Sequence, residues 1–98
     1  MRRVVVRPAA AADIEDAYEW YESRHAGLGD EFLAALQAVQ DRLIEHPEAH
    51  PVVHRNTRRA LIQRRFPYAF FYRIYGDTIV LVACMHVRRN PRRWQRRT

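Results

Sequence analysis

FPYAFFYRIYGDTIVLVACMHVRRNPRRWQRR, residues 66–97, begins as aromatic and β-branched sequence and ends as a run of arginines. Two stretches of β-forming residues, 68–75 and 78–87, flank Gly76-Asp77, a pair typical of a two-residue hairpin turn. A third stretch, RRALIQRRF, occupies residues 58–66. We therefore predict three antiparallel strands. The last should be central, because it is apolar almost throughout and needs cover on both faces.

The first half of the chain has helical spacing instead. RRVVVRP at residues 2–8 is typical of a short strand, and Pro8 suits the first turn of a following helix. Apolar side chains then recur at helical spacing in two segments: Ala10, Ile14, Ala17 and Tyr21, then Phe32, Leu36, Val39 and Leu43. The glycines of HAGLG separate the two helices, and His46-Pro47 ends the second. This order of one strand, two helices and three strands predicts one α+β domain over residues 1–98, with two helices on one sheet and a short basic tail.

The size and composition are those of a single small domain of 98 residues. One cysteine excludes an internal disulfide, and the longest apolar run is far shorter than the ~20 residues that span a bilayer. The residues after Met1 do not resemble a secretory signal. We therefore expect a soluble, cytoplasmic protein with no membrane contact, no cofactor and no bound metal.

Charge is divided unequally along the chain. Residues 1–48 contain five arginines and ten acidic residues, net −5, whereas residues 49–98 contain twelve arginines and one acidic residue, net +11. Such a basic surface attracts polyanions, either nucleic acid or an acidic protein segment. The alternative is a solvated surface with no partner. The chain has no lysine, so no lysine can act as general base or Schiff-base former.

Two residues near the end of the last predicted strand could carry chemistry. His86 is titratable near neutral pH and lies next to the arginines, although a structural histidine is an equal alternative. Cys84 is expected in the core, where apolar neighbours raise the pKa of a thiol. A metal site is not expected, because the sequence has neither paired cysteines nor an HExxH helix.

Two sets of side chains on the first predicted helix are expected to be structural. Acidic residues should form a solvated face: Glu15, Glu19 and Glu22. Aromatic residues should pack between the helix and the sheet: Tyr18, Trp20 and Tyr21.

Basic residues cluster at the ends of the predicted strands and beyond the last one. The clusters are Arg58-Arg59, Arg64-Arg65 and RRNPRRWQRR at residues 88–97. Folding could gather them on one edge of the sheet, where Trp94 would add a flat surface for stacking among the cations. No recognised sequence-reading module for DNA or RNA is present.

Three segments taken together resemble the RelE/ParE superfamily of toxins from bacterial type II toxin–antitoxin modules. They are DIEDAYEWYESRHAGLGDEFLAAL, RRALIQRRFPYAFFYRI and VACMHVRRNPRRWQRR, and the similarity covers nearly the whole chain. The resemblance implies two helices against a mainly antiparallel sheet. It implies one of two activities, ribosome-dependent cleavage of mRNA or inhibition of DNA gyrase, which share one fold.

The residues at the positions that matter for catalysis in the ribonuclease branch favour the gyrase branch. In the ribonuclease branch, the resemblance would give catalytic roles to Arg88 and Tyr72, but Ala69 stands where a strand arginine is expected and Trp94 about where a tyrosine is expected. An indole cannot exchange a proton as a phenol does. A rearranged ribonuclease site would use His86, Arg88 and Arg64, with arginines on the scissile phosphate.

A third hypothesis is a basic module that binds an acidic partner without toxicity. Under all three hypotheses, the closest partner is an acidic or amphipathic segment, which in a toxin belongs to the cognate antitoxin; the toxin's target is gyrase or the ribosome and its mRNA. Residues expected to contact the target or the antitoxin are Arg58, Arg59, Arg65, Tyr72, Arg89, Arg92, Arg93 and Trp94.

Overall fold

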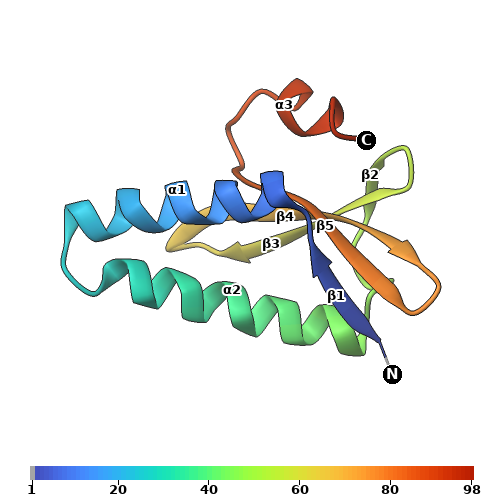
Figure 1. The fold of residues 1–98 in the computed structure, drawn as a ribbon, viewed down its shortest axis with the longest axis horizontal. Helices are drawn as coiled ribbons and strands as arrows, with labels where there is room; N and C mark the ends of the chain where they lie inside the picture. The colour runs from blue at the N-terminus through green and yellow to red at the C-terminus, as the bar shows by residue number, and fades with distance from the viewer. Residues whose placement is uncertain (1) are drawn as a thin grey trace.

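The computed structural model describes residues 2–98, which form one five-stranded sheet with helices on both of its faces (Figure 1). The elements are β1 (Arg3–Val6), α1 (Pro8–Arg24), α2 (Leu28–Glu45), β2 (Val52–His54), β3 (Thr57–Gln63), β4 (Phe66–Tyr75), β5 (Thr78–His86) and α3 (Arg92–Gln95). The strand order is β1-β5-β4-β3-β2. The predicted α+β architecture is confirmed.

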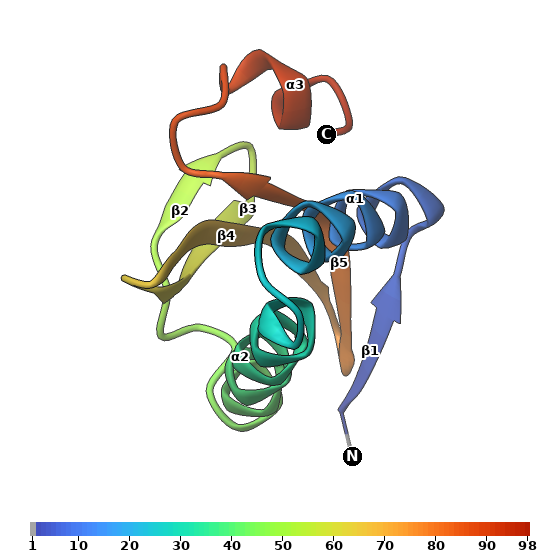
Figure 2. The same cartoon turned by 90° about the vertical axis from the view of Figure 1, so that its left-hand side faces the viewer.

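β5 is the central strand, as its continuous apolar sequence predicts. It pairs in parallel with β1 over residues 78–81 and antiparallel with β4 along most of its length. From Ile79 to Met85 every side chain except that of Val80 is buried. β1 ends at Val6, so the second half of β5 has a strand partner on the β4 side only, and α1 runs beside its other edge (Figure 2).

Two short elements were not predicted. β2 has only three residues, and Arg55 and Asn56 behind it form a turn with positive φ angles of 43° and 62°. α3 has four residues within the segment that we expected to be a tail. A helix this short is not stable alone, so packing rather than helical propensity must hold it.

The main core lies between the two long helices and the sheet. Tyr21 and Phe32 meet Phe66, with ring centroids 5.0–5.5 Å apart. A second cluster lies on the opposite face of the sheet, where Trp94 of α3 stacks on Phe71 of β4 at 4.2 Å with an interplanar angle of 16°. The C-terminal segment therefore covers part of the face of the sheet that the two long helices leave open.

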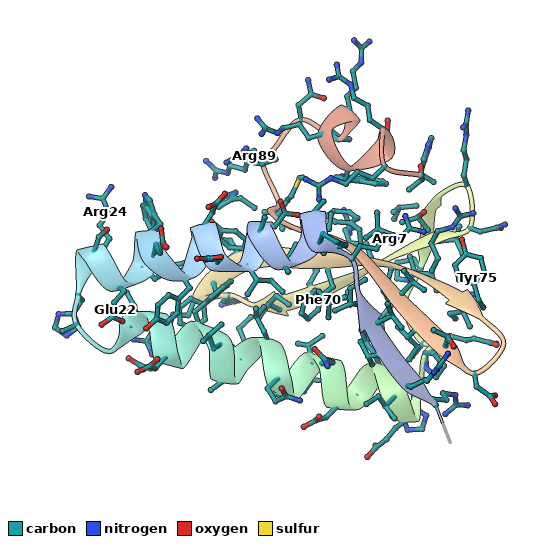
Figure 3. The ribbon with its side chains drawn as sticks, in the orientation of Figure 1. Arg7, Glu22, Arg24, Phe70, Tyr75 and Arg89 are labelled. Atoms are coloured by element: carbon teal, nitrogen blue, oxygen red, sulfur yellow. The ribbon has the colours of Figure 1, made fainter. Side chains whose placement is uncertain are left out.

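The junction between α1 and α2 corrects one prediction. Glu22 does not belong to a solvated face: its carboxylate accepts the N–H groups of Gly27 and Gly29, both at 2.9 Å, at the start of α2 (Figure 3). These N–H groups lack helical partners, and an anion there is favoured. Gly27 has φ 90°, and a Cβ on Gly29 would lie 2.7 Å from the Tyr18 ring. A side chain at position 27 would strain the backbone, and one at position 29 would displace the side chains of Tyr18 and Glu22.

Trp20 also differs from expectation. It was predicted to pack between helix and sheet, but half of it is exposed (50%), whereas Tyr21 beside it is buried. The guanidinium of Arg24 lies 4.6 Å from the centroid of the indole. One turn of helix separates these two residues, so the cation covers a ring that the sheet does not reach.

Candidate interaction surface

The basic clusters do not all gather at one edge of the sheet. The turn with Arg64 and Arg65 joins β3 to β4, and Tyr68 at the start of β4 is paired with His86 at the end of β5. This turn therefore lies at the same end of the sheet as the arginines that follow β5. Arg58 pairs with Tyr72 further along β4 and lies seven positions before Arg65, which places the two roughly 20 Å apart along the strand.

Two arginines predicted to contact a partner already bind the chain itself. Arg58 donates from Nη1 to the carbonyls of His50 and Glu48, at 2.6 and 3.1 Å, and so fixes the loop after α2. Arg65 forms an exposed ion pair of 2.7 Å with Glu31 of α2. Exposed pairs of this kind are weak, so Arg65 can be released to a partner at little cost, whereas releasing Arg58 would free the loop.

Two aromatic residues predicted to contact a partner are inside the protein. Tyr72 is fully buried and donates its hydroxyl to the carbonyl of Pro47, and burial raises its pKa to about 12. Trp94 is 6% exposed because it stacks on Phe71, with His54 against its edge. Neither ring can be reached by a partner in this conformation. Both residues hold the fold together.

The end of the chain contains an ion pair that the sequence did not reveal. Arg97 donates to both carboxylate oxygens of Asp13 on α1, at 2.6 and 3.1 Å, and to the carbonyl of Val82 at 3.2 Å. Asp13 also accepts the N–H of Cys84 at 3.0 Å. The pair thus binds backbone groups of β5 beyond the end of β1. The partners are 84 residues apart, and no local pattern signals such a contact.

Four arginines remain exposed between the end of β5 and the Trp94 anchor: Arg88, Arg89, Arg92 and Arg93. Among residues 2–98 only Arg65 and Arg97 form ion pairs, so none of the four has an acidic partner within the chain. We call these residues the arginine array. His86 precedes the array, and its Nδ1 accepts the N–H of Arg88 at 3.1 Å.

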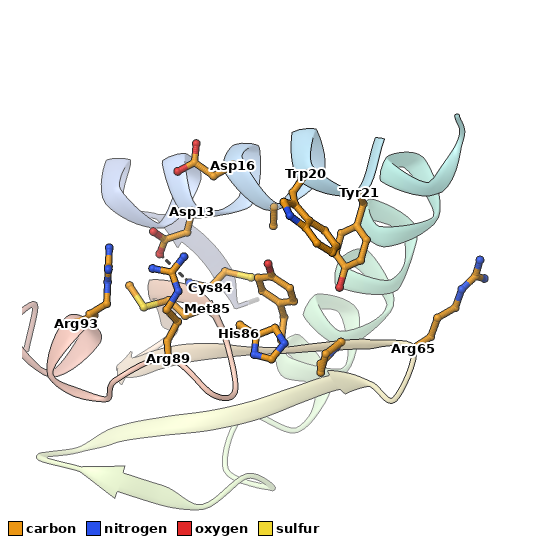
Figure 4. A pocket seen from close by; sticks show the side chains of 13 residues that line it. Asp13, Asp16, Trp20, Tyr21, Arg65, Cys84, Met85, His86, Arg89 and Arg93 are labelled. Atoms are coloured by element: carbon orange, nitrogen blue, oxygen red, sulfur yellow. Dashed lines mark hydrogen bonds between the residues drawn. The ribbon is translucent and has the colours of Figure 1, made fainter. Parts of the chain in front are cut away.

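A groove of about 660 Å³ lies between α1 and the segment that follows β5. Asp13, Asp16 and Trp20 of α1 line one wall, and Arg89 and Arg93 lie across from them (Figure 4). Tyr21, Tyr68 and His86 also line it, and Arg65 lies toward its far end. The volume is typical of a ligand or side-chain binding site.

Burial changes the titration of the groups in this groove. It raises the pKa of Tyr21, with Tyr68 and Cys84 adding to the effect. Burial also raises the pKa of Tyr68, against which the charge of Arg89 acts in the opposite direction. Desolvation raises the pKa of Cys84 strongly, followed by the charge of Asp13, so the thiol is protonated and inert as predicted.

The predicted catalytic set is only partly assembled. His86 and Arg88 are held together by the Nδ1 contact, and Arg64 lies in the β3–β4 turn at the same end of the sheet. The imidazole could move a proton through Nε2, and the arginines could bind a phosphate. Within residues 2–98 no three histidine, cysteine or acidic side chains lie close enough together to hold a metal ion. None of the helices in this range combines the length and the hydropathy of a membrane-spanning helix.

Comparison with known proteins identifies one family. The family model described as ParE toxin of type II toxin-antitoxin system, parDE, matches residues 4–91. A solved chain from the chromosomal ParDE toxin–antitoxin system of P. aeruginosa superposes with a TM-score of 0.66 at 19% identity, covering 89% of this chain and 97% of that one. At this identity the likeness concerns the fold. A search of curated proteins gave no match.

Proposed function

Because the chain belongs to the ParE toxin family of type II toxin–antitoxin systems, we propose that it arrests bacterial growth by inhibiting DNA gyrase. Membership confirms the superfamily that the sequence resembled and implies a cognate ParD antitoxin. The proposal concerns the target, on which the two branches of the superfamily differ.

The burial of Tyr72 and Trp94 carries this proposal. A ribonuclease of the RelE type would need groups at these two positions to touch the RNA. Here one is fully buried and bonded to Pro47, and the other is stacked under α3. A buried phenol whose pKa is raised to about 12 is a poor proton carrier near neutral pH. The exposed arginines that follow β5 suit binding rather than cleavage.

The arginine array is the surface we assign to gyrase. Its four guanidinium groups are exposed, have no acidic partner within residues 2–98 and follow one another on a short anchored segment. Arginine forks bind carboxylate or phosphate groups bidentately, so the array fits an acidic protein surface or DNA held by the enzyme.

One observation favours a second candidate, cleavage of ribosome-bound mRNA. The N–H of Arg88 fixes the imidazole of His86 through Nδ1, which leaves Nε2 for proton transfer beside the array. In that mechanism Arg88 and Arg64 would bind the scissile phosphate and His86 would move the proton.

Two assays on the purified protein separate the candidates. We expect it to inhibit supercoiling by gyrase and to leave mRNA on occupied ribosomes uncut. His86→Gln should then keep full inhibition, because the gyrase mechanism needs no proton carrier. Ribosome-dependent cleavage that His86→Gln abolishes, with supercoiling untouched, would reverse the assignment. Normal growth of cells that produce the folded chain without antitoxin would contradict both and favour a non-toxic binding module.

A further inference from the structure

Two arginines lie side by side on the face of the sheet that α3 covers in part, opposite α2 (Figure 2). Arg59 of β3 is paired with Phe71 of β4, whose ring lies under α3. Arg73 follows Phe71 by two positions, so all three side chains point to the same face of the sheet. Arg59 and Arg73 are therefore diagonal neighbours on adjacent strands, with Cα atoms roughly 7–8 Å apart.

Neither of these guanidinium groups is neutralised by the chain. The ion pairs within residues 2–98 are those of Arg65 and Arg97, so Arg59 and Arg73 have no acidic partner there. Arg59 is exposed, and the guanidinium of Arg73 lies 5.6 Å from the ring centroid of Tyr75, which is itself half exposed. Two like charges on neighbouring strands repel each other, and an anion between them would relieve that repulsion.

Unsatisfied hydrogen-bonding groups lie next to this pair of cations. Nε of Arg73 and Oγ1 of Thr57 are buried and have no hydrogen-bond partner within residues 2–98. Thr57 is fully buried, and the register that pairs Arg58 with Tyr72 places Thr57 opposite Arg73. Buried polar groups without partners are rare and costly, so two of them in neighbouring positions point to a ligand that supplies the missing bonds.

The geometry of arginine fits that ligand to an oxyanion. A guanidinium binds two oxygens of one phosphate or carboxylate in parallel, and the side-on form of this contact uses Nε. Nε of Arg73 is the donor that the chain leaves unpaired. Arg59, one strand away, can reach the same anion or the next one along a polyanion. The pair therefore has the donors and the charge for a phosphate.

The composition of the strands decides which polyanion fits this face. None of the strands described within residues 2–98 contains Asp or Glu, and neither does α3. A DNA strand places one negative charge about every 3.4 Å, so it needs a surface that acidic side chains do not interrupt. The outer face of α1 is acidic, with Glu15, Asp16 and Glu19 exposed, and would repel it. Charge complementarity thus favours DNA on the strand face.

We propose that Arg59 and Arg73 form a phosphate site that binds the backbone of the duplex DNA on which gyrase acts. This rests on the proposed function, which makes gyrase the target. The arginine array continues into α3, and Trp94 of α3 stacks on Phe71, the cross-strand neighbour of Arg59. The phosphate site therefore lies beside the array on one basic surface. The toxin then holds gyrase partly through the DNA that the enzyme has bound.

The test measures DNA affinity as a function of salt. A fluorescently labelled DNA duplex is titrated with wild type, with Arg59→Gln and with the double variant Arg59→Gln/Arg73→Gln. Arg24→Gln/Arg42→Gln, at exposed positions on α1 and α2, is the charge-matched control. Each lost phosphate contact should lower the slope of log affinity against log salt concentration by about one, and should weaken binding about tenfold at about 0.1 M salt.

We therefore expect the slope to fall by about one for the single variant and by about two for the double variant, and to stay unchanged for the control. Circular dichroism and the melting temperature verify folding. The single variant changes an exposed side chain only, so it tests the site even if the double variant is destabilised.

Four results would overturn the proposal. Slopes equal to wild type in both site variants would make the two arginines a solvated surface, and equal losses in site and control variants would assign binding to net charge. Tighter binding of an RNA of the same length would replace DNA as the ligand. Loss of gyrase inhibition in the site variants, without any binding of the duplex by wild type, would assign the surface to an acidic part of gyrase.

Supercoiling assays on the same proteins test the proposed function separately. We expect the double variant to inhibit gyrase more weakly than the control does. Wild-type protein that binds DNA with the expected slopes but does not inhibit gyrase would contradict the proposed function and leave the phosphate site in place. Full inhibition by a double variant that no longer binds DNA would overturn the role of the site in holding gyrase.

Discussion

Arginines of the second half of the chain fall into two groups that the sequence does not distinguish. Arg58 and Arg97 donate to backbone carbonyls, and Arg97 also to a carboxylate, so both hold segments of the fold in place. Arg88 and Arg92, in the same RR pattern, have exposed side chains that pair with no acidic group in the described part of the chain. An arginine run is therefore no measure of a binding surface. Each guanidinium must be assigned by what lies within its reach.

The anchored group makes the array possible. Residues 87–93 form a loop and the first residues of a four-residue helix, which cannot hold its shape alone. Trp94 stacks on Phe71 and so fixes the C-terminal segment to one face of the sheet, and the ion pair between Arg97 and Asp13 fixes the same segment to α1. The array is thus held between the end of β5 and two anchors. Loss of an anchor should change the free energy of unfolding, whereas loss of the array should not.

The largest effect on stability is expected from Asp13→Ala. It leaves the partly buried guanidinium of Arg97 unpaired and removes the acceptor of the Cys84 N–H. Breaking a buried pair from one side costs about 3–5 kcal/mol, and because both side chains keep some exposure we expect about 2–3 kcal/mol. Urea denaturation measures the change. Arg96→Ala, at the exposed neighbouring position, is the control and should stay within about 0.5 kcal/mol. Equal stability of both variants would mean that the pair is not an anchor.

An intermediate effect is expected from Tyr72→Phe. The hydroxyl bonds the carbonyl of Pro47, a contact worth about 1 kcal/mol. The pKa of Tyr72 is raised from 10.0 to about 12 in the folded state, so the folded chain retains a proton that the unfolded chain loses. Stability from this group is complete below pH 10 and falls as the pH rises from 10 to about 12. Urea denaturation between pH 9 and 12 should show a shallower loss for Tyr72→Phe than for wild type. Parallel curves would contradict the assignment.

Sequence reasoning succeeded where the signal is periodic and failed where contacts are long-range. Spacing of apolar residues located both long helices, and the unbroken apolar run placed β5 at the centre of the sheet. The ring of Trp94 looked like an exposed stacking surface, because nothing near it in sequence shows that Phe71 lies beneath it. Asp13 drew no attention at all, since its partners are Cys84 and Arg97.

The residues of the groove show the same difference between local sequence signals and long-range contacts. The sequence identified His86 and the adjoining arginines, because they form a continuous pattern. Tyr68 and Tyr21 were assigned to a strand and to the core, which is where their rings lie. Only the tertiary arrangement shows that their hydroxyl groups form no hydrogen bond with other groups of residues 2–98. Trp20 was predicted to be packed, and its exposure depends on where the sheet stops beneath α1.

The smallest effect on stability, together with a complete loss of function, is expected from replacing the whole array with alanine. The variant changes Arg88, Arg89, Arg92 and Arg93. Their side chains are exposed and form no ion pair with any group of residues 2–98. The hydrogen bond of Arg92 to Asn90 uses the backbone N–H of Arg92, which alanine keeps. Each exposed substitution should change the free energy of unfolding by only about ±0.5 kcal/mol. Growth assays should show loss of toxicity with a normal urea curve.

A control with the same change in charge decides what that loss means. Alanine at four exposed arginines away from the array, Arg3, Arg24, Arg42 and Arg55, lowers the net charge equally. Net charge acts on association over long range and is weakened by salt, whereas the array must act through contact. We therefore expect the control variant to remain toxic. If both variants lose toxicity together, overall charge rather than the anchored array controls binding to the target. If the array variant is folded and still fully toxic, the four arginines are a solvated surface. The contact with the target must then lie around Arg64 and Arg65 in the β3–β4 turn.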